Sequence, residues 1–140
     1  SDMVVSRQQL EAALPKPVSK AVVLRTLPNP EVKKNTDYSG TNPPYLEAKG
    51  LDWLRKQGVK HLLLDLPSVD REEDGGTLAA HKALWGLPGH PRPEATITEL
   101  IYVPQHLEDG RYLLNLQVAA FDNDACPSRP VLFPLERVQE

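Results

Sequence analysis

The residues best suited to chemistry lie between Asp65 and Glu99. An acidic stretch, DLPSVDREEDGG, begins at Asp65 and leads into the segment TLAAHKALW, which carries His81. Glu99 lies further on, in the apolar-leaning segment ATITELIYV. Imidazole nitrogens and carboxylate oxygens bind zinc and also serve as general acids and bases. Two interpretations are open: half of a metal or acid–base site, or a solvated loop that precedes a helix.

Of the four histidines, His81 has the sequence surroundings most typical of a functional residue. We expect the other three histidines, His61, His90 and His106, to be solvated surface residues. His81 follows a segment typical of a buried strand, and ligands of open α/β sheets bind beyond the carboxyl ends of the strands. The sequence therefore predicts that His81 lies within reach of the strand-end residues Asp65, Ser68 and Asp70.

The carboxylates allow simpler interpretations as well. The acids from Asp70 to Asp74 fit a solvated loop whose negative charge favours the amino end of the following helix. Glu99, inside an expected strand, costs free energy unless its carboxylate faces water or binds something. On the residues alone, metal binding or catalysis by His81 and Glu99 remains one of two interpretations.

Hydrophobic periodicity predicts the elements that position these residues. We expect helices over residues 6–16, 45–58 and 77–86, and strands over residues 21–27, 61–67, 95–103, 111–121 and 129–135. Thr77 and Gly86 are the expected caps of the third helix. The order predicts an α/β fold, one domain over residues 1–140, with parallel crossovers early and antiparallel strands late in a mixed sheet.

Composition excludes several functional classes. The net charge of −3 and the absence of a basic cluster argue against a nucleic-acid or anionic-membrane surface. No apolar run reaches the roughly 20 residues of a membrane span, and the first residues do not resemble a signal peptide. Cys126 is the single cysteine, so an intrachain disulfide is impossible and we expect a cytoplasmic location. Gly-rich phosphate loops, GxSxG, HExxH and paired CxxC motifs are all missing.

The motifs together resemble the cyclase family of metal-dependent hydrolases, which includes kynurenine formamidase and isatin hydrolase. The resemblance lies in DLPSVD, a variable acidic loop, AHKALW and a strand with TELIYV, and it extends over nearly the whole chain. It implies that His81 and Glu99 are metal ligands, and that Asp65, Ser68 and Asp70 line the site. It also implies a divalent metal, zinc or manganese, and hydrolysis of an amide-type C–N bond of a small molecule. The implied fold is the swivelling-type domain of that family, in truncated form.

One part of the family pattern is missing. Members carry an earlier H-x-G-T-H-x-D-x-P-x-H motif that supplies most of the metal ligands, and this chain has no such motif. A catalytic zinc takes about three protein ligands plus an open position, and the resemblance identifies two. We expect the third from Asp70 or His106, from a second copy in a homo-oligomer such as a dimer, or from a different chain. Tyr38, in the long connector between Leu27 and Tyr45, is a further candidate for lining a pocket.

Three hypotheses follow from this. The chain is an amide hydrolase whose metal site another chain completes, a catalytically inactive oligomeric half-domain that serves as a binding or interaction module, or a fragment of a longer enzyme. The sequence identifies no particular substrate.

Overall fold

The computed structural model describes residues 1–135, and the chain divides into two compact units, Ser1–Pro104 and Gln105–Glu140. The expectation of one partial family domain over residues 1–140 stays a prediction. Within the described residues, the first unit contains β1 to β5 and α1 to α3, and the second contains β6 and β7. The functional candidates from Tyr38 to Glu99 belong to the first unit, whereas His106, a candidate third ligand, belongs to the second.

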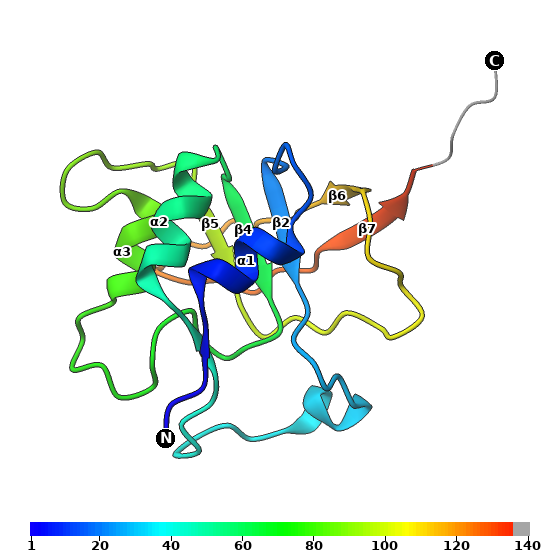
Figure 1. Ribbon diagram of the computed structural model, residues 1–140, viewed down its shortest axis with the longest axis horizontal. Helices are drawn as coiled ribbons and strands as arrows, with labels where there is room; N and C mark the ends of the chain where they lie inside the picture. The colour runs from blue at the N-terminus through cyan, green and yellow to red at the C-terminus, as the bar shows by residue number, and fades with distance from the viewer. Residues whose placement is uncertain (136–140) are drawn as a thin grey trace. The chain divides into compact units, whose positions relative to one another are not determined.

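The main sheet of the first unit is parallel and has the strand order β2-β4-β5 (Figure 1). Its strands are β2 (Ala21–Leu24), β4 (His61–Leu64) and β5 (Thr96–Thr98), with β4 in the centre. Two further strands, β1 (Val4–Val5) and β3 (Tyr45–Leu46), form a separate parallel pair. In the second unit, β6 (Tyr112–Asn115) and β7 (Val131–Pro134) form an antiparallel hairpin.

The predicted α/β class is confirmed, with parallel strands early and antiparallel strands late. The strands form three separate small sheets in the described residues, whereas the sequence analysis expected one mixed sheet. Most strands are also shorter than periodicity suggested, because many of the apolar residues beyond their ends lie in turns and loops.

Three helices supply the apolar side chains that bury one face of the main sheet. They are α1 (Arg7–Ala13), α2 (Ala48–Lys56) and α3 (Ala79–Trp85), and α2 packs alongside α3 (Figure 1). Alternate strand residues, Val22, Leu62 and Leu64, join the core from the sheet. Leu54 and Leu84 join it from the helices and are fully buried. This core fixes α3, and therefore His81, beside α2 and the residues that follow β4.

Two expectations about the site region were wrong. Glu99 does not lie inside a strand, because β5 ends at Thr98 and the chain turns at Leu100, which has a positive φ of 55°. Thr77 does not cap α3: the helix begins at Ala79, and its N-cap residue is Leu78 in the left-handed conformation. Gly86, as expected, ends α3 with a φ of 73°.

None of the helices in the described part of the chain has the length and apolar character of a membrane span.

Candidate functional site

The carboxyl ends of the three parallel strands bring the first polar residues of the site together. Thr26 lies just beyond β2, Asp65 directly follows β4 and Glu99 directly follows β5. Because parallel strands end at the same edge of a sheet, these residues and their loops share one edge. Two separate polar clusters form there, one around Asp65 and one around His81.

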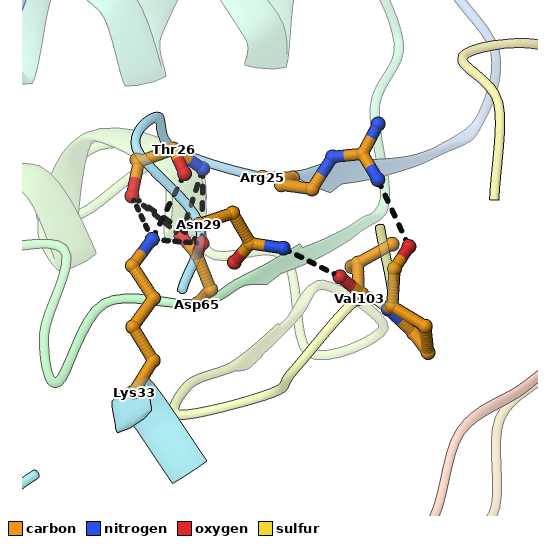
Figure 2. Close-up of polar contacts among 7 residues, drawn as sticks. Arg25, Thr26, Asn29, Lys33, Asp65 and Val103 are labelled. Carbon is orange, nitrogen blue, oxygen red and sulfur yellow. Dashed lines mark hydrogen bonds and ion pairs between the residues drawn. The ribbon is translucent and has the colours of Figure 1, made fainter. Parts of the chain in front are cut away.

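Asp65 is buried in the first cluster (Figure 2). Its carboxylate accepts hydrogen bonds from the Thr26 backbone N–H at 3.0 Å and from the Thr26 hydroxyl at 3.1 Å, and it pairs with Lys33 Nζ at 2.8 Å. Lys33 Nζ also donates to the Thr26 carbonyl oxygen at 2.8 Å. Lys33 lies on the 3₁₀ helix η1 (Glu31–Asn35), so this buried ion pair attaches the long connector to the end of β4.

Two further hydrogen bonds attach the residues that follow β2 to the segment after β5. Asn29 Nδ2 donates to the Val103 carbonyl oxygen at 2.8 Å, and Arg25 Nη1 donates to the Pro104 carbonyl oxygen at 3.0 Å (Figure 2). The connector is thus held by buried and half-buried polar contacts near its start. Asp65, which was predicted to line a pocket, lies buried where it anchors the connector, and its pocket-lining role stays a prediction.

The first unit contains a pocket of about 480 Å³. Its lining comes from the connector, from the acidic loop and from two leucines: Thr36, Asp37, Tyr38, Ser39, Pro43, Pro67, Ser68, Asp70, Arg71, Glu72, Asp74, Leu78 and Leu100. Tyr38, Ser68 and Asp70, which the sequence analysis singled out, are among them. The volume is within the range of small-molecule sites.

Carboxylates of the acidic loop hold the backbone around this pocket in place. Glu72 accepts hydrogen bonds from Gly40 N–H at 2.6 Å and from Asn42 N–H at 2.8 Å, so it fixes the connector to the acidic loop. Asp74 accepts from Leu78 N–H and Gly76 N–H, and the Leu78 bond above all lowers the pKa of Asp74. The backbone N–H of Ser39 likewise lowers the pKa of Asp37. The acidic loop is therefore an ordered wall, not merely a solvated segment.

The second cluster joins Asp70, His81 and Glu99. His81 Nδ1 lies 2.7 Å from Asp70 Oδ2, and His81 Nε2 lies 3.5 Å from Glu99 Oε1. Glu99 Oε1 also accepts a hydrogen bond from Val69 N–H at 2.9 Å. The His81 side chain is 15% exposed and that of Glu99 is 28% exposed. The structure thus brings the two predicted ligands together, each with one contact that fixes its orientation.

The spacing of His81 and Glu99 fits two ligands of one metal ion. Ligand atoms about 2.0–2.2 Å from a tetrahedral zinc are about 3.3–3.6 Å from each other, and the observed separation is 3.5 Å. The residues that the structure describes contain no group of three or more His, Cys, Asp or Glu side chains that could hold a metal. Asp70, one candidate for the third ligand, already contacts His81 Nδ1 and the start of α3. His81 and Glu99 therefore fit two ligand positions of a metal site, but the described residues do not supply a complete set of ligands.

Sequence reasoning missed Lys33 and Glu72, which shape the site without taking part in a recognisable motif. Both act across long sequence separations, Lys33 on Asp65 and Glu72 on Gly40. Their partners depend on the path of the connector, and no local spacing encodes that path.

Comparison with known proteins gives consistent matches. A family model described as "Putative cyclase" matches residues 1–71, just over half of the chain. A kynurenine formamidase of Bacillus cytotoxicus is 37% identical over 93 residues, which are 66% of this chain and 41% of that relative. Kynurenine formamidases of Bacillus cereus and Bacillus anthracis are each 36% identical over the same shares. The match thus spans well under half the length of these curated relatives.

Proposed function

This chain belongs to the cyclase family, and we propose that it contributes His81 and Glu99 as two metal ligands to a metal-dependent hydrolase that acts on amide C–N bonds. The observation that carries the proposal is the 3.5 Å separation of His81 Nε2 and Glu99 Oε1. The similarity to kynurenine formamidases supports the reaction class.

The chemistry of the two side chains suits zinc or manganese. A neutral imidazole nitrogen and a carboxylate oxygen are ligands that both ions accept. When bound, such an ion would polarise the amide carbonyl as a Lewis acid. Because the described residues supply two ligands, we propose that the remainder come from elsewhere: a second copy, a different chain, or a further part of a longer protein.

The adjacent pocket is the proposed place for the substrate. Asp70 belongs both to the pocket lining and to the His81 cluster, so the two are contiguous. Tyr38 offers an aromatic ring in the pocket lining, which suits an aryl amide such as a formylated aromatic amine. Glu72 accepts a hydrogen bond from the connector backbone, and Lys33 ties the connector to Asp65, so both help to fix the wall that carries Tyr38.

Hydrolysis of N-formylkynurenine tests the reaction class. The purified chain is assayed with added Zn²⁺ or Mn²⁺, first alone and then after mixing with lysate fractions from its source organism. The fractions used are those that have no formamidase activity of their own. Metal-dependent hydrolysis that His81→Ala and Glu99→Gln each abolish supports the proposal. Activity that persists in both variants, or no hydrolysis of any formyl-amide under all these conditions, contradicts it.

A second candidate function rests on the second unit. One face of the β6–β7 hairpin presents Leu113 directly opposite Phe133, together with Val131, and all three are exposed. A two-stranded hairpin is marginally stable without further packing. We propose as the alternative that the chain is a catalytically inactive module that self-associates through this face. Light scattering after size exclusion at micromolar concentration tests it: a dimer that Phe133→Glu dissociates supports the alternative, and a monomer contradicts it.

A further inference from the structure

The Asp70 carboxylate makes three polar contacts with residues at the start of α3. Its Oδ1 accepts a hydrogen bond from Ala80 N–H at 2.6 Å, and its Oδ2 accepts one from His81 N–H at 3.2 Å. The same Oδ2 lies 2.7 Å from the His81 ring nitrogen Nδ1. The side chain is 7% exposed, so water does not substitute for these partners.

The first two contacts replace a missing helix cap. The N-cap residue of α3 is Leu78, which has no side-chain acceptor and lies in the left-handed conformation. The free N–H groups of the first helical turn need acceptors, and Asp70 supplies them from about ten residues upstream. This accounts for the backbone contacts, but capping does not require the contact with the imidazole ring.

The ring contact determines where the His81 proton lies. An ionised carboxylate only accepts hydrogen bonds, so the short contact with Asp70 requires the proton of a neutral imidazole on Nδ1. Nε2 then carries a lone pair, and it faces Glu99 Oε1, which is also an acceptor and is already bonded to Val69 N–H. Two facing acceptors repel each other unless a cation or a proton lies between them.

We propose that Asp70 is a positioning residue: it selects the Nδ1–H tautomer of His81 and so presents Nε2, together with Glu99, to a divalent cation. The metal part of this inference rests on the proposed function, whereas the tautomer part rests on the contacts of Asp70 alone. Partners that orient a ligating histidine in this way typically contribute about 10–100-fold to metal affinity.

Asp70→Asn separates capping from positioning. Asparagine is a good N-cap residue, and its Oδ1 can still accept from Ala80 N–H. With Oδ1 on Ala80 N–H, its NH₂ group lies at the position of Oδ2, where it loses the weaker bond from His81 N–H and donates to His81 Nδ1, so the imidazole proton moves onto Nε2. If Asp70 only capped α3, Asp70→Asn would have little effect on the His81 ring.

The test combines ring ¹⁵N NMR of His81 with zinc affinity, using the full chain. Spectra are recorded after chelator treatment at about pH 8.5, where an ordinary imidazole is neutral, and His81→Ala assigns the signals. We expect a protonated Nδ1 in the wild-type chain and a protonated Nε2 in Asp70→Asn. Zinc affinity, measured by competition with a chromophoric chelator, should fall at least about tenfold in Asp70→Asn. Asp70→Ser, whose shorter side chain reaches neither the ring nor the amino end of α3, is the second variant and should weaken zinc binding similarly.

The outcomes distinguish this inference from the proposed function. An Nε2–H tautomer or a doubly protonated ring in the wild-type chain overturns the inference, and that measurement needs no variant to fold. Zinc binding of equal affinity in the wild-type chain, in Asp70→Asn and in Asp70→Ser also overturns it. An Nδ1–H tautomer that reverses in Asp70→Asn, with zinc binding in neither protein even after mixing with the lysate fractions described above, supports the tautomer assignment and contradicts the proposed metal function.

Discussion

Replacing Lys33 with methionine should destabilise the first unit, because it leaves the Asp65 carboxylate buried without its cation. The Asp65 side chain has no exposed surface, and Lys33 Nζ contacts it at 2.8 Å. The same ammonium group donates to the Thr26 carbonyl oxygen and lies 2.9 Å from the Thr26 hydroxyl. Methionine matches the length of the lysine stem, so the change removes mainly the charge and these hydrogen bonds.

The size of the effect follows from what Asp65 keeps. Breaking a buried ion pair by removing one partner costs about 3–5 kcal/mol. Asp65 retains the N–H and hydroxyl of Thr26, and Lys33 is 15% exposed, which admits some water. We therefore expect a loss of about 2–4 kcal/mol in the free energy of unfolding. Removing both charges, in Lys33→Met with Asp65→Asn, should cost at least about 1 kcal/mol less than the sum of the single changes.

Urea unfolding followed by tryptophan fluorescence measures this loss. The two tryptophans of the chain, Trp53 and Trp85, both lie in the first unit, so the signal reports on that unit. Lys56→Met is the matched control: its pair with Asp52 is exposed, Arg55 also contacts Asp52, and the expected change is below about 0.5 kcal/mol. A loss below about 1 kcal/mol for Lys33→Met, or additive single changes, would refute the view that this ion pair anchors the connector.

Two other changes test the wall of the pocket and the end of α3. Backbone hydrogen bonds lower the pKa of Asp74 below its usual 3.8, so the stabilisation that its carboxylate provides is complete above that value and is lost as the pH falls through the lower pKa of the folded state. In Asp74→Asn, the free energy of unfolding should therefore fall less steeply over that acidic range. Gly86→Ala should destabilise by at least about 2 kcal/mol in the same urea assay, because the new Cβ would meet the His90 carbonyl oxygen at a φ of 73°, whereas Gly75→Ala, at a φ of 66° with open space around it, should cost clearly less.

Much of the fold was predictable because it depends on local patterns. The apolar run at His61–Leu64 and the helical spacing of Leu51 and Leu54 both correspond to observed elements. The rule that ligands bind at the carboxyl ends of parallel strands also predicted that His81 lies within reach of Asp70, and His81 Nδ1 is 2.7 Å from Asp70 Oδ2. The ends of the elements were less predictable, since Leu78 and Leu100 adopt positive φ values that leucine rarely takes.

The details of the site depended on contacts that sequence spacing does not encode. Asp65 and Asp70 are similar acids near one strand end, yet Asp65 pairs with Lys33 and Asp70 contacts His81. The difference arises from the path of the connector, which brings Lys33 to Asp65 from 32 positions away. The wall of the pocket formed by Tyr38 and Glu72 depends on the same path.

Zinc binding by the purified chain tests the central claim most directly, namely that His81 and Glu99 hold one ion together. Competition with a chromophoric chelator gives the affinity of the wild-type chain, of His81→Ala, of Glu99→Gln and of the double variant. His90→Ala, which removes an exposed histidine elsewhere in the first unit, is the control for adventitious binding. We predict that each single change weakens binding at least about tenfold, or 1.4 kcal/mol, that the double change adds little more, and that His90→Ala has no effect. Equal zinc affinity in the wild-type chain and both single variants would contradict the account.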